Sequence, residues 1–121
     1  MTEPNYGPST RALHNPVERT EFGETSDAIF LTSGFVYDNA EQAAATFTGD
    51  VEHYQYSRFG NPTTDALQRR LADLEGAEAC IVTASGMGAV SSALLSHVKT
   101  GDRVVASRAL VGSCYWIVTQ L

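Results

Sequence analysis

The chain has 121 residues, of which 43% are hydrophobic and 18% charged, and its formal net charge is −6. This is the length and composition of one globular domain, not of a disordered or fibrous protein. The acidic balance disfavours a nucleic-acid surface, because the basic residues are scattered and only Arg69-Arg70, expected on a solvated helix face, are adjacent. The sequence has no apolar run of membrane-spanning length and no signal-peptide pattern, so we expect a soluble cytoplasmic protein.

Residues 1–60 form a polar arm with weak periodicity. The arm contains a short apolar run at residues 28–31 and a predicted helix from Glu41 to Phe47, which begins behind the capping candidate Asn39. A segment with so few periodic apolar positions rarely folds alone, because it buries too little surface to offset its conformational entropy. We therefore expect the arm to depend on contacts outside itself.

A regular pattern begins at Asn61-Pro62. Proline at the first helical position loses no N–H that the helix needs, so this dipeptide is a typical helix start. The predicted helix carries one apolar stripe and ends at Gly76, and the stripe consists of Leu67, Leu71 and Leu74. Such a stripe predicts a helix that packs on a sheet.

The following segments predict an α/β fold. Residues 79–83 and 103–106 are expected to form buried strands, with a helix over residues 86–98 between them. Strand, helix, strand at this spacing is typical of a right-handed βαβ unit with parallel strands. Residues 112–121 begin another helix without a closing signal. Since a parallel sheet needs more strands than two, we expect residues 61–121 to be the truncated first part of a larger domain.

The junction Thr83-Ala84-Ser85-Gly86-Met87-Gly88 is a candidate phosphate site. Unpaired N–H groups and the helix dipole attract an anion to a helix N-terminus, glycines allow close approach, and Ser85 can add a hydroxyl donor. The structural alternative, in which Gly-x-Gly only makes the turn, stays open on this motif alone. A dinucleotide site is disfavoured, because Ser91 replaces the third glycine and no acidic residue ends the next strand.

A nucleophile elbow is disfavoured at the same junction, because Thr83 and Met87 stand where Gly-x-Ser-x-Gly requires glycines around Ser85. No metal site is expected, since Cys80 and Cys114 lack metal-ligand spacing. Upstream, Tyr56-Ser57-Arg58 can make a compact anion clamp, in which a guanidinium offers two parallel hydrogen bonds and a phenol adds another. The alternative is a packed Tyr56 beside a solvated Arg58.

The run Tyr-Ser-Arg-Phe-Gly-Asn-Pro-Thr at residues 56–63, with Ala-Ser-Gly-Met-Gly-Ala at residues 84–89, resembles the Cys/Met-metabolism enzymes that use pyridoxal phosphate. The resemblance extends from about Arg11 to the end of the chain. It implies an aspartate aminotransferase-like domain of fold type I, with pyridoxal 5′-phosphate as cofactor. The family includes cystathionine γ-synthase, the cystathionine lyases, methionine γ-lyase and the homoserine-ester sulfhydrylases, and residues 22–38 and 105–114 are most similar to the O-succinylhomoserine sulfhydrylase branch.

The resemblance also implies roles for particular residues. Ser85, Gly86 and Met87 would hold the cofactor phosphate, through the hydroxyl of Ser85 and the backbone N–H groups of the other two. Tyr56 and Arg58 would reach the same phosphate from a neighbouring subunit, and the Tyr56 phenol is a candidate for proton transfer at the substrate amine. Residues 1–60 are then an arm that acts in trans, and the chain is expected to form a homodimer or a dimer of dimers.

Two departures from the family pattern bear on function. Val111 stands where the family places a tyrosine or phenylalanine that stacks on the pyridine ring. The only lysine, Lys99, does not match the lysine that binds the cofactor, which the family places far beyond residue 121 together with the aspartate at the pyridine nitrogen. The chain alone is therefore expected to be inactive.

The reaction expected of the whole protein is replacement at Cγ of an amino-acid ester, in which O-succinylhomoserine and sulfide give homocysteine and succinate. Cystathionine synthesis and γ-elimination of cystathionine or methionine stay open as alternatives. A non-catalytic interaction fragment is a reading of a different class, and a nucleotide-phosphate domain that uses Gly86-x-Gly88 is the weakest.

Overall fold

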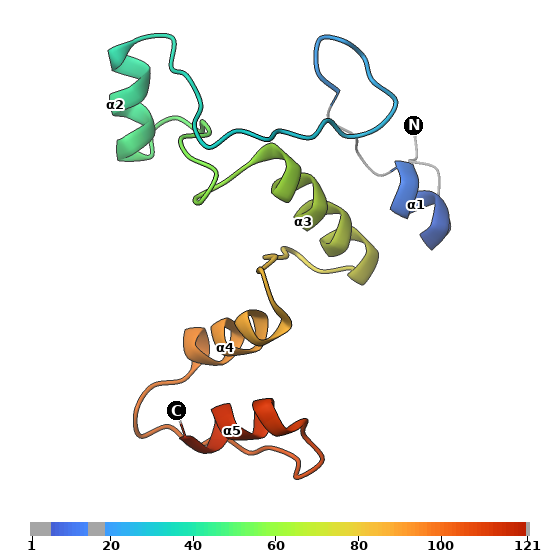
Figure 1. The fold of residues 1–121 in the computed structure, drawn as a ribbon, viewed down its shortest axis with the longest axis vertical. Helices are drawn as coiled ribbons and strands as arrows, with labels where there is room; N and C mark the ends of the chain where they lie inside the picture. Colours follow the sequence, from blue (N-terminus) through green and yellow to red (C-terminus); the bar gives the residue numbers. More distant parts are fainter. Residues whose placement is uncertain (1–5, 15–18, 121) are drawn as a thin grey trace. The chain divides into compact units, whose positions relative to one another are not determined.

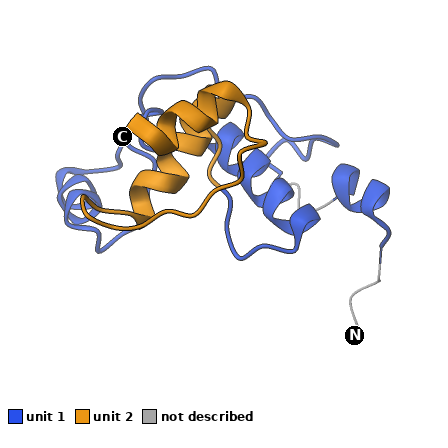
Figure 2. Ribbon diagram, turned by 90° about the horizontal axis from the view of Figure 1, so that it is seen from below, with its two compact units in different colours: residues 1–80 blue, residues 81–121 orange. Residues whose placement is uncertain are grey.

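The computed structural model describes residues 6–14 and 19–120, and it divides the chain into two compact units, residues 1–80 and residues 81–121 (Figures 1 and 2). The first unit contains α1 (Pro8–His14), α2 (Ala40–Thr48) and α3 (Pro62–Glu75), and the second contains α4 (Gly86–His97) and α5 (Gly112–Gln120). The sequence predicted a different division, between an arm over residues 1–60 that contacts a neighbouring subunit and a larger domain that begins at residue 61. That division stays a prediction. None of the helices in the described ranges is long and apolar enough to cross a membrane.

The helices begin and end where local capping signals stand. Asn39 caps α2, because its side chain accepts a hydrogen bond from the Gln42 N–H at 2.7 Å. Gly76 ends α3 in the left-handed region, with φ of 64°, where residues with a Cβ are strained. The predicted helices over residues 41–47, 62–75 and 86–98 are thereby confirmed, to within one residue at each end. The predicted helix from Gly112 is confirmed as far as residue 120, and Leu121 lies outside the described residues.

The predicted strands at residues 79–83 and 103–106 are wrong for this structure, and so is the predicted βαβ unit. Neither segment forms a strand, and in the described part of the chain the one β-bridge joins Gly34 and Tyr56. A strand requires a neighbour for its N–H and C=O groups, and the apolar side chains that suggested burial are exposed, with Ile81 82% and Val105 92% accessible. The leucine stripe of α3 likewise meets no sheet among the described residues, and it stays more than a third exposed.

Helix α1 has no predicted counterpart in the sequence, and it is held by a contact between residues distant in sequence. The Arg11 side chain lies on Asp73 of α3, with its Nε 2.8 Å from Oδ2 and its Nη2 donating to the Asp73 carbonyl oxygen. A second ion pair joins Arg70 Nη2 to Asp27 Oδ2 at 2.6 Å. Arg70 is therefore mostly buried and not part of a solvated face as expected, whereas Arg69 is exposed.

The second unit is built on the contact between α4 and α5, where Ile117 is 7% exposed. Ser85 caps α4 and Val98 ends it. The chain then turns through residues 99–102, where the Lys99 N–H donates to Asp102 Oδ2 at 2.8 Å and Gly101 has φ of 98°. The apolar contact and the local caps thus define this unit without a sheet.

Glu24 closes a turn at residues 20–24 and provides a test of the local structure. Its carboxylate accepts hydrogen bonds from the Thr20 N–H and hydroxyl, both at 2.7 Å, and the backbone N–H of Thr20 above all lowers the pKa of Glu24 below its ordinary value. Because the folded-state pKa is lowered, the turn is stabilised above the ordinary pKa and loses this stabilisation as the pH falls through the folded-state value.

We predict that Thr20→Ala raises the pKa of Glu24 toward its ordinary value, since the hydroxyl donor is lost while the N–H donor stays. The measurement is an NMR titration of the Glu24 side-chain carboxyl carbon in both proteins. An unchanged midpoint in Thr20→Ala would show that the hydroxyl does not bind the carboxylate in solution.

Candidate functional site

The N-terminal end of α4 presents three groups to an anion, and we call Ser85, Gly86 and Met87 the α4 anion seat. Ser85 is the N-cap, with extended backbone, and its Oγ accepts a hydrogen bond from the Gly88 N–H at 3.0 Å. Its carbonyl oxygen accepts from the Ala89 N–H at 3.1 Å and from the Thr83 hydroxyl at 2.7 Å. The Ser85 side chain is thus fixed over the first turn, while its own hydroxyl proton stays available to a ligand.

The backbone N–H groups of Gly86 and Met87 complete the seat. The first N–H groups of an α-helix have no acceptor within the helix. Those of Gly88 and Ala89 are bonded to Ser85, which leaves the N–H groups of Gly86 and Met87 without an acceptor among the described residues. Two N–H donors, one hydroxyl and the positive end of the helix dipole together suit a phosphate.

Gly88 leaves little space for a side chain beside the α4 anion seat. A Cβ at this position would lie 3.2 Å from Ser85 Oγ and 3.5 Å from Thr83 Oγ1. A side chain here would therefore shift the capping hydroxyl by a few tenths of an ångström, whereas a Cβ on Gly86 would meet nothing within 4 Å. The residues at this end of α4 fit a phosphate group, because glycine keeps the hydroxyl in place and leaves an open approach to the N–H groups.

Tyr56 and Arg58 lie on a tight turn over residues 56–60, in the first unit. The Tyr56 carbonyl oxygen accepts hydrogen bonds from the Phe59 N–H at 2.9 Å and the Gly60 N–H at 3.3 Å. The Arg58 guanidinium carbon lies 5.1 Å from the centre of the Tyr56 ring and 5.4 Å from that of Phe59. Stacking uses the faces of the guanidinium and leaves its N–H edge, with the exposed Tyr56, open to an anion.

Val111 stands directly before α5 and is 67% exposed. Its carbonyl oxygen accepts the Tyr115 N–H at 3.0 Å, so it acts as the cap residue of this helix. The adjacent open hollow, of about 560 Å³, is formed by residues from both helices of the unit, namely Met87, Ser91, Gly112, Ser113, Trp116 and Ile117. The start of α5 therefore shares a hollow with one residue of the α4 anion seat.

Trp116 is a lining residue that the sequence did not indicate. It is 60% exposed and borders the same hollow as Met87. Its position in α5 follows from the pairing of α4 with α5, which no local pattern in the sequence indicates. Tyr115, beside it, does not line this hollow.

Lys99 lies apart from the α4 anion seat. It follows the C-terminal end of α4, while Ser85 stands at the other end, and a helix of 12 residues is about 18 Å long. The residue is exposed and its N–H is bound to Asp102. Nothing in this geometry brings the lysine to the anion seat of its own unit.

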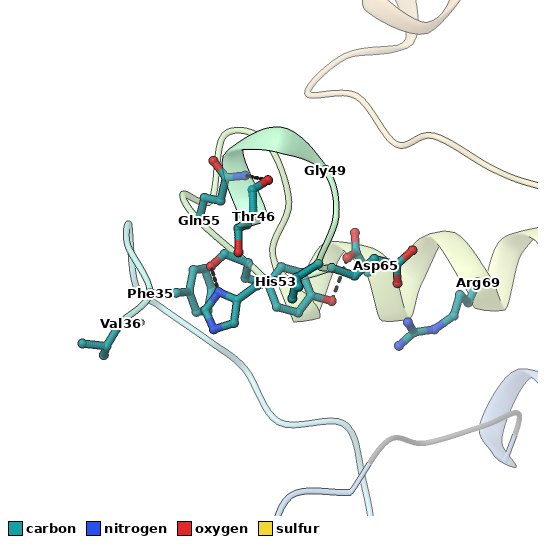
Figure 3. A pocket seen from close by; sticks show the side chains of 11 residues that line it. Phe35, Val36, Thr46, Gly49, His53, Gln55, Asp65 and Arg69 are labelled. Carbon is teal, nitrogen blue, oxygen red and sulfur yellow. Dashed lines mark hydrogen bonds between the residues drawn. The ribbon is translucent and has the colours of Figure 1, made fainter. Parts of the chain in front are cut away.

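A second hollow, of about 880 Å³, lies in the first unit beside α2 and α3 (Figure 3). Within it the Tyr54 hydroxyl donates to Asp65 Oδ2 at 2.8 Å, and His53 Nδ1 lies 2.6 Å from the Tyr54 carbonyl oxygen. Gln55 Nε2 donates to the Thr46 carbonyl oxygen at 3.4 Å. These bonds hold together the segment that leads into the 56–60 turn, and neither Tyr56 nor Arg58 lines the hollow.

The structure thus groups the predicted site residues by unit. Ser85, Gly86 and Met87 lie together at the start of α4, with the start of α5 across a shared hollow. Tyr56 and Arg58 lie together on the 56–60 turn.

Comparison with known proteins identifies relatives over almost the whole chain. The chain is 47% identical over 113 residues to an O-succinylhomoserine sulfhydrylase of Mycobacterium tuberculosis, covering 93% of this chain and 28% of that protein. It is 42% identical over 114 residues to an L-methionine gamma-lyase of Porphyromonas gingivalis, covering 94% and 29%. The chain therefore spans less than a third of the length of these relatives.

A solved structure is also similar to this chain over almost its whole length. A putative O-acetylhomoserine (thiol)-lyase from Campylobacter jejuni superposes with a TM-score of 0.88 and 34% identity, over 96% of this chain and 28% of that one. That crystal structure contains N′-pyridoxyl-lysine-5′-monophosphate, so the relative carries pyridoxal phosphate on a lysine. Residues 9–121 match the model of the Cys/Met metabolism PLP-dependent enzymes. The chain belongs to this family, whose cofactor is pyridoxal 5′-phosphate.

Proposed function

We propose that the protein carrying this chain uses pyridoxal 5′-phosphate to replace the succinyl group of O-succinylhomoserine by sulfide. In this reaction the Cγ–O bond breaks, a Cγ–S bond forms, and homocysteine and succinate are released. The 47% identity to an O-succinylhomoserine sulfhydrylase, against 42% for a methionine gamma-lyase, favours replacement over elimination. The observation that carries the proposal is the α4 anion seat, which suits the cofactor's phosphate.

The residues of this chain bind and orient the cofactor in the proposed site. Ser85 donates its hydroxyl, and Gly86 and Met87 their N–H groups, to the phosphate. Arg58 and Tyr56 approach the same phosphate from a second copy of the chain, which makes a homodimer, or a dimer of dimers, the functional unit. When bound, the cofactor supplies an electron sink for carbanion chemistry.

Tyr56 and Val111 have further proposed roles. The exposed Tyr56 phenol, whose ring lies beside the Arg58 guanidinium, exchanges a proton with the substrate amine. Val111 covers one face of the pyridine ring with aliphatic surface. It excludes water there without the stacking that an aromatic ring adds.

The residues 1–121 alone lack a lysine placed for this chemistry, since Lys99 stands at the far end of α4. We therefore propose that catalysis needs a lysine and an aspartate from polypeptide beyond these residues. A second candidate, a non-catalytic interaction module, is favoured by the exposed apolar side chains of the first and second units, among them Leu31, Ile81 and Val105.

The proposed reaction is tested with the protein purified from its natural source. Supplied with O-succinylhomoserine and sulfide, it should release homocysteine and succinate in equal amounts, whereas purified residues 1–121 should release neither. Methionine serves as the competing substrate in a parallel assay. Cleavage of methionine without homocysteine formation would reject the replacement reaction, and turnover by residues 1–121 would reject the need for a further lysine.

Gly88→Ala tests the α4 anion seat. The added Cβ shifts the Ser85 hydroxyl by a few tenths of an ångström and so weakens its bond to the phosphate. We expect pyridoxal 5′-phosphate to bind up to about tenfold more weakly, at most the size of one hydrogen bond to a charged group. Alanine favours the helix over glycine, so the melting temperature should not fall. The matched control is Gly7→Ala, where a Cβ meets nothing within 4 Å. Equal binding by both variants would contradict the seat.

Val111→Phe tests the ring-covering position. An aromatic ring there should tighten binding of pyridoxal 5′-phosphate about two- to tenfold, because aromatic pairs gain roughly 0.5–1.5 kcal/mol beyond buried area. Val36→Phe is the control, since Val36 is 90% exposed in the other unit. The readout is a titration of each variant with the cofactor. Weaker binding in Val111→Phe would show that residue 111 does not face the pyridine ring.

A further inference from the structure

The 56–60 turn, with its exposed Tyr56 and Arg58, is hydrogen-bonded to the buried residue that follows it. Asn61 follows the turn and is only 6% exposed, which is unusual for a polar side chain. Buried amides are retained when their donors and acceptors are satisfied. The partners of Asn61 therefore show what its burial accomplishes.

The Asn61 side chain makes two kinds of bond. Its Oδ1 accepts the Thr63 N–H at 2.8 Å, which caps α3. Its Nδ2 donates to the Phe30 carbonyl oxygen at 3.1 Å and to Ser57 Oγ at 2.9 Å. The acceptor thus starts the helix, and the two donors tie that start to the 56–60 turn and to an extended segment about 30 residues earlier.

Ser57 completes the connection, and it stands between the two proposed phosphate ligands. Its N–H donates to the Ser33 carbonyl oxygen at 2.9 Å and its hydroxyl donates to the Thr32 carbonyl oxygen. The Phe30 N–H in turn donates to Thr63 Oγ1 at 2.9 Å. Residues 30–33, 57 and 61–63 therefore form a closed set of hydrogen bonds beneath the turn.

We propose that Asn61 is a positioning residue that presets the 56–60 turn for a phosphate. Through Ser57 it holds the backbone between Tyr56 and Arg58, so that their side chains approach the anion with less ordering entropy to lose on binding. The inference rests on the proposed function, in which these two side chains bind the cofactor phosphate. It adds a residue that touches no ligand itself.

Asn61→Asp separates positioning from capping. Aspartate caps a helix as well as asparagine does, so α3 should keep its circular dichroism signal. The variant lacks the Nδ2 donor, so the amide exchange rate of Ser57 should rise about tenfold or more, since the bonds from Asn61 to Ser57 Oγ and to the Phe30 carbonyl oxygen are lost. Asn39→Asp is the matched control, because it makes the same change at the exposed cap of α2.

The consequence for binding is measured by titrating residues 1–121 with pyridoxal 5′-phosphate. We expect about fivefold to tenfold weaker binding in Asn61→Asp and no change in Asn39→Asp. Ser57→Ala removes the same contact without adding a charge, so it should weaken binding too. Asn61→Asp should then cost less in the Ser57→Ala background than in the original chain, because the two changes share one hydrogen bond.

Arg58→Ala distinguishes failure of this inference from failure of the proposed function. Weaker binding in Arg58→Ala with unchanged binding in Asn61→Asp overturns the positioning role. Unchanged binding in Arg58→Ala, or no binding by the original chain, overturns the phosphate role of the turn and with it this inference. Unchanged Ser57 amide exchange in Asn61→Asp overturns the hydrogen-bonded lock itself.

Discussion

The buried amide of Asn61 is the constraint on which the first unit depends. One side chain begins α3, anchors the extended segment at Phe30 and fixes Ser57 within the 56–60 turn. Asn61 itself is only 6% exposed, and a buried amide left without partners costs about 1–3 kcal/mol. Because the functional candidates Tyr56 and Arg58 are exposed, their placement comes from this buried neighbour and not from packing of their own.

What the sequence predicted well is what the chain decides locally. Asn39 and Asn61 each start a helix through a bond spanning at most three residues, and Gly76 ends α3 through backbone freedom. The strands predicted at residues 79–83 and 103–106 would need neighbouring strands, and the described residues form none. The short α1 is held by the bond from Arg11 to Asp73, which lies 62 positions away in the sequence. No local sequence pattern therefore predicts this helix.

The residues of the candidate site likewise divide into those that local sequence predicts and those that depend on contacts between distant segments. The α4 anion seat could be predicted because a cap, two glycines and a helix dipole are all set within six residues. The importance of Tyr56 and Arg58 came from the family resemblance, because Tyr-x-Arg alone does not indicate an anion clamp. The Asn61 donors and the position of Trp116 required the fold, since both depend on pairing between segments distant in sequence.

The segments around Ile81 and Val105 have a consequence for how the chain associates with other chains. Each presents exposed apolar side chains on backbone that has no ladder among the described residues. Such a segment is a template for strand addition by any chain with a matching edge, including another copy. The net charge of −6 opposes that association only weakly at physiological salt. These two segments are therefore where we expect association with another chain to begin, whereas the helices can form without them.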